Sequence, residues 1–99
     1  MGLTMTRNTG GWDITECHVE VAGAAAQVFN FELALYGTDE QPGFVLRGDG
    51  LIFADGRVRF NRELELLQIL ATAGENPQRV LDSVAQRLRS KSDSRIPSA

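Results

Sequence analysis

The sequence is poor in cysteine, in histidine and in long apolar runs, and each shortage excludes a class of protein. Cys17 is the only cysteine among 99 residues, so no disulfide can form within one chain and a disulfide-stapled secreted scaffold is excluded. No apolar run approaches the ~20 residues that a membrane-spanning helix needs. The first residues also lack the apolar core of a signal peptide. We therefore expect a cytoplasmic protein that does not bind membranes.

Basic residues are scarce in the first half of the chain. Residues 1–46 hold one basic and six acidic side chains, a net −5, while residues 47–99 hold nine basic and seven acidic ones, a net +2. The total of −3 gives no positive field for non-specific binding to nucleic acid or to anionic membranes. The asymmetry is typical either of charge pairing between neighbouring strands or of one acidic and one basic surface.

The composition is otherwise that of a globular protein, with 42% hydrophobic and 23% charged residues. We expect residues 1–11, which are rich in Thr, Gly and Asn, to form a flexible N-terminal leader. Residues 12–89 are predicted to form a single domain. The polar residues 90–99 are predicted to form a disordered C-terminal tail.

Alternating apolar residues predict an antiparallel β-meander of about five strands in residues 12–60. In the first strand Cys17 and Val19 point to one side, but Trp12 and Ile14 fall on the opposite parity, so we expect a bulge or a twist near Thr15. The connections Gly48-Asp49-Gly50 and Asp55-Gly56 are interpreted as tight hairpin turns, the second of type I′. The predicted strands cover residues 12–21, 27–36, 44–47, 51–54 and 57–60.

The period changes from 2 to 3.6 after residue 60, which predicts two helices. Asn61 is expected to cap a helix over residues 62–73, and Gly74 to end it in the left-handed conformation. Asn76 and Pro77 are expected to start a second helix over residues 77–89. The predicted fold is therefore an α+β domain in which two C-terminal helices pack on one face of the sheet.

The first of these helices is more apolar than one contact with a sheet requires. Its apolar surface can be covered by the second helix or by the same helix of a second subunit. A homodimer is thus one of two alternatives for this chain. The residues assigned to this dimer or helix-packing face are Leu66, Ile69, Leu70 and Ala73.

Side chains able to bind metal occur together only in Glu16-x-His18-x-Glu20, on one side of the first strand. A closed site needs a fourth ligand, and there is no second histidine. We therefore interpret this segment as a solvated strand face and expect neither a metal nor a cofactor. Cys17 has the apolar parity, so we expect a buried, inert thiol rather than a nucleophile. No catalytic motif is recognised, and we expect that the protein is not an enzyme.

Arginines gather on the outward parity of the last predicted strands. Arg47, Arg57 and Arg59 are expected to form a protein-interaction surface together with Tyr36 and Glu32, with Glu32 paired across strands. The same arginines with Tyr36 could instead hold single-stranded nucleic acid, although the other aromatic residues needed for base stacking have the inward parity.

These features favour a small non-enzymatic protein-interaction module, such as an adaptor, an inhibitor or an immunity-type protein. A phage or mobile-element inhibitor of the anti-CRISPR-like kind fits the size and the acidic strands, which can imitate a phosphate backbone. The alternative is a single-stranded nucleic-acid-binding protein that uses the arginine-bearing face. The expected partner is another protein, whose identity the sequence does not specify.

Overall fold

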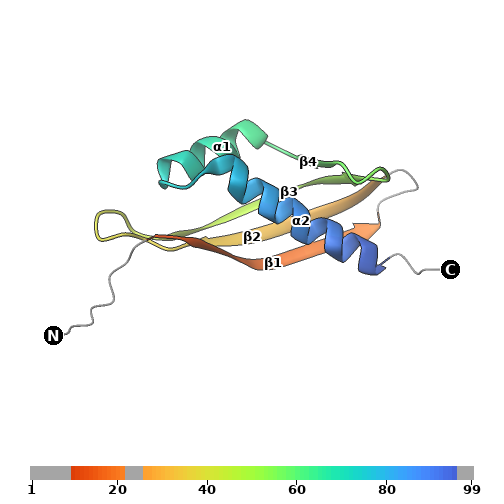
Figure 1. The fold of residues 1–99 in the computed structure, drawn as a ribbon, viewed down its shortest axis with the longest axis horizontal. Coiled ribbons are helices and arrows are strands. Elements are labelled where there is room, and N and C mark those ends of the chain that lie inside the picture. Colours follow the sequence, from red (N-terminus) through yellow and green to blue (C-terminus); the bar gives the residue numbers. More distant parts are fainter. Residues whose placement is uncertain (1–9, 22–25, 96–99) are drawn as a thin grey trace.

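The chain folds into one antiparallel sheet and two helices (Figure 1). The computed structural model describes residues 10–21 and 26–95. Its strands follow the order β1-β2-β3-β4, so each pairs with its neighbour in sequence. This confirms the predicted α+β class and the β-meander. The elements are β1 (Trp12–Val21), β2 (Ala26–Leu35), β3 (Phe44–Phe53), β4 (Val58–Phe60), α1 (Glu63–Thr72) and α2 (Pro77–Arg95).

The sheet has four strands instead of five because the predicted hairpin at Gly48-Asp49-Gly50 does not exist. These residues continue β3, and the prediction is wrong. Two phenylalanine rings of β2 explain the glycines. A Cβ on Gly48 would lie 2.4 Å from the ring of Phe31, and one on Gly50 would lie 2.7 Å from the ring of Phe29. The glycines therefore make room for aromatic rings, a role that glycine has inside strands as well as in turns.

The turn between β3 and β4 is a hairpin, as predicted, but not of type I′. That type requires two central residues with positive φ, and among the residues of this turn only Gly56 has one, at 91°. The N–H of Gly56 donates to the C=O of Phe53, and the N–H of Phe53 donates to the C=O of Arg57. The connection is thus a three-residue loop that ends in a left-handed glycine.

The predicted bulge lies where it was expected, in β1. The register between β1 and β2 shifts between Ile14 and Glu16, so that Thr15 is the extra residue. Because side chains alternate along a strand, one extra residue reverses the parity. Ile14 therefore pairs with Leu33 while Cys17 pairs with Phe31, and the apolar side chains of both halves face the same side of the sheet.

Helix α2 covers this apolar side, which we call the inner face. Figure 1 shows α2 crossing the sheet diagonally, and it packs on β1 and β2. The rings of Phe29, Phe31 and Phe60 meet beneath the helices, with Phe60 edge-on to both others. The fully buried side chains, from both layers, are Val19, Phe29, Leu33, Leu70, Val80, Leu81, Val84 and Leu88.

Helix α1 begins differently from the prediction, because Asn61 is not its N-cap. Arg62 occupies the cap position in the left-handed region, with φ 56°, and no side chain caps the helix. The Asn61 amide donates instead to the Asp49 carboxylate at 3.3 Å. At the other end Gly74 is left-handed as predicted, and the N–H of Glu75 donates back to the C=O of Leu70. This pair of features is a Schellman motif.

Helix α2 is longer than predicted. It begins as expected, with the Asn76 side chain accepting the N–H of Arg79 at 3.2 Å and Pro77 in the first position. It then continues to Arg95 instead of ending at residue 89, so residues 90–95 are helical and not a disordered tail. Ser92, which is buried, donates to the side chain of Gln27 in β2. This contact fixes the last turns of α2 to the sheet. Residues 96–99 of the predicted tail lie outside the described residues.

The predicted leader also ends earlier than expected. The N–H of Gly10 donates to the C=O of Gly37, and Gly11 accepts from the N–H of Tyr36. Gly11 also donates to the Glu75 carboxylate at 3.1 Å. These two glycines are therefore part of the folded structure, and the remainder of the leader, residues 1–9, lies outside the described residues. In the part of the chain that the structure describes, no helix has the length and apolar character to cross a membrane.

Candidate functional site

The side of the sheet opposite the helices, which we call the outer face, carries the residues that the sequence singled out. Inner-face side chains in the middle of β1, β2 and β3 are buried, some at the strand ends are half-buried or, for Phe44, exposed, and the outward neighbours are exposed or half-buried. No described element covers this face. Its residues are Asp13, Thr15, Glu16, His18 and Glu20 of β1, Ala26, Val28, Asn30, Glu32 and Ala34 of β2, Val45, Arg47, Asp49, Leu51 and Phe53 of β3, and Arg59 of β4.

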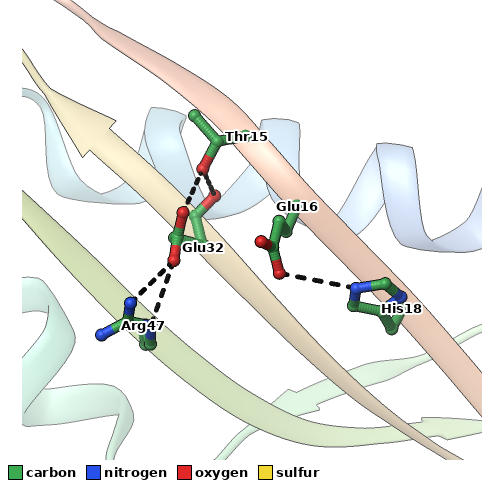
Figure 2. Close-up of polar contacts among 5 residues, drawn as sticks. All are labelled: Thr15, Glu16, His18, Glu32 and Arg47. Carbon is green, nitrogen blue, oxygen red and sulfur yellow. Dashed lines mark hydrogen bonds and ion pairs between the residues drawn. The ribbon is translucent and has the colours of Figure 1, made fainter.

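A polar row crosses three strands in the middle of the outer face. Glu32 and Arg47 are cross-strand partners, and both the Nε and the Nη2 atoms of Arg47 lie 3.1 Å from Oε1 of Glu32. The hydroxyl of Thr15 donates to the other carboxylate oxygen at 2.8 Å (Figure 2). The Glu32 side chain is only 18% exposed while that of Arg47 is 77% exposed. The row therefore holds a largely covered carboxylate and presents a fixed guanidinium to solvent.

The bulge explains why Thr15 completes this polar row. As the extra residue of β1, Thr15 lies beside Glu32 without being its regular partner, which is Glu16. Its hydroxyl reaches both the carboxylate and the backbone C=O of Glu32, the latter at 3.2 Å. The sequence pattern located the bulge, but nothing in it indicated that Thr15 would bind Glu32. The pairing of Arg47 with Glu32 was predicted, and the structure contains it.

A second row lies nearer the β3–β4 hairpin. The register aligns Glu20 with Val28, Val28 with Leu51, and Leu51 with Arg59. Val28 is exposed and Leu51 is half-buried. Among the described residues the Arg59 side chain has neither an ion-pair nor a hydrogen-bond partner. This row thus places an apolar patch between a carboxylate at one end and an unpaired guanidinium at the other.

The predicted arginine set is not gathered at one point. The Nε of Arg57 lies 2.8 Å from Asp55 Oδ2, and its guanidinium stands 5.1 Å from the ring centroid of Phe53. The backbone N–H of Arg57 also donates to Asp55, and this hydrogen bond, more than the guanidinium, lowers the pKa of the Asp55 carboxyl. Arg47 and Arg57 therefore each contact an acid of the chain, and of the three arginines only Arg59 has no such contact among the described residues.

Tyr36 lies apart from the arginines. It follows β2 directly, beyond the pair formed by Leu35 and Phe44. Arg59 pairs with Leu51, seven positions further along β3 than Phe44, which corresponds to about 23 Å of strand. Tyr36 is exposed, but no base stacked on it would reach Arg59 directly. The structure thus separates residues that the sequence pattern had grouped.

The pair Glu16 and His18 forms the only other contact of the outer face drawn in Figure 2. The two side chains meet at 3.5 Å between Nε2 and Oε1, and both are well exposed. Within the described residues, no group of three His, Cys, Asp or Glu side chains is placed to hold a metal ion. Glu16, His18 and Glu20 are all exposed to solvent.

Cys17 lies on the inner face, in the core. Burial raises the pKa of its thiol, although the charges of Lys91 and Arg87 act in the opposite direction. A thiol with a raised pKa holds its proton at neutral pH and is a poor nucleophile. The structure therefore places Cys17 as the pattern predicted, among apolar side chains.

The residues assigned to a dimer or helix-packing face divide into two groups. Leu66 and Leu70 are buried within the chain, where they belong to the core. Ile69 and Ala73 are half-buried and line a cavity of about 450 Å³ together with Phe44 and Pro42. Packing inside the chain accounts for the burial of the first pair, although Leu66 also lines a groove of about 660 Å³ beside β3. The second pair lines the cavity of about 450 Å³.

The comparisons with known proteins add no relative. No protein-family model, curated protein or solved structure matches this chain.

Proposed function

We propose that this chain is a non-enzymatic protein-interaction module that binds a partner protein through the outer face of its sheet. The observation that carries the proposal is the pair of cross-strand rows on a face that no other element of the described residues covers. Val28 is 39% exposed and Val45 is 51% exposed, and they lie on either side of the ordered Glu32–Arg47 pair. Apolar patches beside arginine are typical of the centre of protein interfaces.

Pre-organisation supports this function. A surface arginine loses side-chain entropy when a partner immobilises it, at about 0.5–1.5 kcal/mol for a side chain of this kind. The two contacts from Arg47 to Glu32, with Thr15 on the other oxygen, restrict that side chain before any partner arrives. An arginine held in this way binds a carboxylate of another protein with a smaller entropic loss than a free one.

The role of an inhibitor, an immunity-type protein or an adaptor agrees equally with a small module of this kind. The alternative, binding of single-stranded nucleic acid, has less support. Arg47 and Arg57 already hold carboxylates, and Tyr36 lies far along the sheet from Arg59. A path for a phosphate backbone requires consecutive unpaired cations with stacking aromatic side chains between them.

The test is capture of partners on the immobilised chain from a lysate of the source organism, with quantification by mass spectrometry. The outer-face variant combines Val28→Ser with Arg59→Glu, which changes two members of the second row. The matched control combines Gln86→Ser with Arg79→Glu on the exposed side of α2.

We expect one partner protein whose recovery falls about tenfold or more with the outer-face variant, as for loss of a central interface residue. Recovery with the α2 control should equal that with the wild-type chain. Equal recovery with all three proteins would refute the outer face as the binding surface. Binding of a fluorescent oligothymidylate that weakens steeply with salt and with Arg59→Glu would instead support the nucleic-acid alternative.

A further inference from the structure

One long edge of β3 has no neighbouring strand. β4 pairs only with Gly50, Leu51 and Ile52. Residues 44–49 therefore have β2 on one side and no strand of the described chain on the other. Edges of this kind attract further strands because their backbone groups are unpaired.

The direction of the backbone groups along this edge follows from the hairpin. The N–H of Phe53 donates to Arg57, and the C=O of Asp49 accepts from Asn61, so both residues direct their backbone groups toward this edge. Because a strand has a period of two, the N–H and C=O groups of Val45 and Arg47 point the same way. Among the described residues these groups have no hydrogen-bond partner. The edge therefore offers alternating donors and acceptors to an extended chain.

A groove runs beside these backbone groups, between the β3 edge and α1. Its volume is about 660 Å³, and its apolar lining is Leu46, Leu66 and Ile69. Ile69 also lines the adjoining cavity of about 450 Å³, which Phe44 closes at the start of β3. Side chains of an added strand would alternate between this groove and the outer face. The groove is also lined by Asn61, Arg62 and Glu65. The occupant's side chains that face Leu46 and Ile69 should thus be apolar.

The charge of Arg47 on the outer face indicates a further residue of the added strand. The polar row Thr15–Glu32–Arg47 ends at this edge, and the exposed guanidinium of Arg47 is its last group. An acidic residue directly opposite Arg47 on an added strand would continue the row with the opposite charge, and such cross-strand pairs are stabilising.

We propose that the free edge of β3, beside α1, accepts an extended segment of a partner protein as a fifth strand. That segment has apolar residues facing Leu46 and Ile69, and an acidic residue opposite Arg47. The proposal rests on the proposed function, a protein-interaction module, and names the form in which the partner binds. Strand addition of this kind obtains affinity from the backbone and specificity from alternate side chains.

Neither a symmetric β3–β3 pair of two copies nor the chain's own first residues fits this description. In a symmetric β3–β3 pair, the register that places Asp49 opposite Arg47 also places residues 44–46 of the copy beside Gly50–Ile52. β4 already occupies that position. Residues 1–9 contain no acidic residue. The charge of Arg47 therefore favours a strand from another protein.

The experiment is a selection of random linear peptides displayed on phage against the full chain. We expect enriched peptides with alternating apolar residues and one Asp or Glu at a fixed position. Selection against Arg47→Gln, which keeps a donor for Glu32, should lose the acidic residue and keep the apolar alternation.

The edge itself is tested with two substitutions at one position. Val45→Pro removes the outward N–H, and proline is tolerated on an edge where the N–H faces solvent. It should weaken binding of an enriched peptide about tenfold. The substitution removes one hydrogen bond and also distorts the strand, so the loss of binding free energy is larger than for the hydrogen bond alone. Val45→Thr keeps the N–H and should change the affinity by less than about twofold.

Hydrogen exchange in the wild-type chain gives a reading that does not depend on how Val45→Pro folds. On addition of the enriched peptide, the amides of Val45 and Arg47 should become protected. Failure to enrich peptides of this pattern, or equal binding by Val45→Pro and Val45→Thr, would overturn the proposal.

Protection of both amides before any peptide is added would also overturn it. If that protection depended on protein concentration, a second copy would be the occupant. If it vanished on removal of residues 1–9, the occupant would be the chain's own first segment. A partner captured from lysate whose recovery depends on Arg59 but not on the Val45 N–H would leave the proposed function standing and refute the strand addition.

Discussion

The two faces of this sheet are built from the same strands, yet different forces hold their side chains. On the inner face, rings and aliphatic side chains fill one another's space, and even the glycines of β3 are covered by Phe29 and Phe31. On the outer face each ion pair has at least one well-exposed partner, and surface pairs of this kind are worth about 0–1 kcal/mol each. The stability of the fold is therefore concentrated on one face, which leaves the residues of the other face free to serve binding.

The largest difference between the faces should appear at two neighbouring positions of β2. Phe29 is fully buried and Val28 is exposed. Phe29→Ala should lower the free energy of unfolding by about 3–5 kcal/mol, because it leaves a cavity beside the rings of Phe31 and Phe60. Val28→Ala should cost less than about 1 kcal/mol. Urea denaturation of both variants measures the contrast, and similar losses would contradict the assignment of the two faces.

The next largest effect concerns the glycines that admit the rings. A Cβ on Gly50 would lie 2.0 Å from the backbone oxygen of Arg59, which cannot move without disturbing β4. Gly50→Ala should therefore cost about 3 kcal/mol. Gly56→Ala is the control, since its Cβ meets nothing within 4 Å but its φ is positive, and it should cost about 1–2 kcal/mol. Thermal and urea unfolding give both values. A smaller loss of stability for Gly50→Ala than for Gly56→Ala would show that the close approach of Arg59 does not exclude a side chain at position 50.

A smaller effect is expected where the end of α2 meets the sheet. Ser92→Ala removes the hydrogen bond to Gln27 and should cost about 1 kcal/mol. Ser83→Ala on the same helix is the matched control, because it gains the same helix propensity but loses only a local bond to the Arg79 carbonyl. Unfolding curves should show that Ser92→Ala is less stable than Ser83→Ala. Equal stability would mean that the last turns of α2 do not hold the sheet.

The smallest effect is a pH dependence at the rim of the outer face. The Arg57 N–H and guanidinium lower the pKa of Asp55. A carboxyl with a folded pKa below its unfolded value stabilises the fold above the unfolded pKa, and this contribution disappears as the pH falls through the folded value. Asp55→Asn should therefore lose slightly less stability than the wild type between neutral and acidic pH. The carboxyl titration followed by NMR should show the lowered pKa, and a value at or above the ordinary one would contradict the contact.

The parts of the fold that sequence predicts well are those set by near neighbours in the chain. Alternation indicated the faces of β1 and β2, and the mismatched parity of Trp12 and Ile14 located the bulge. Gly74 and Asn76 marked the corner between the helices because caps are local structures. The length of α2 was underestimated because its last turns are polar and depend on a contact between Ser92 and the distant Gln27.

The errors in β3 and in the site have the same origin in distant contacts. Gly48-Asp49-Gly50 has the composition of a turn, and only the rings of Phe29 and Phe31, brought from another strand, explain why the chain stays extended there. The arginines all have the outward parity of their strands, but this parity does not predict which acidic side chain each arginine contacts. Asp55 next to Arg57 in a turn was a local signal for one such pair. The involvement of Thr15 depended on the bulge and on the rotation of its side chain.

The order of the elements has a consequence for how the chain folds as it is synthesised. Each strand pairs with the one before it, so the sheet can assemble hairpin by hairpin as the chain emerges from the ribosome. Its inner face, however, is covered by α2, which follows all four strands. A sheet that has formed before α2 emerges exposes Phe29, Phe31 and Leu33 together, and such surfaces promote aggregation. The interval between completion of β4 and docking of α2 is thus the stage at which a chaperone would protect this protein most.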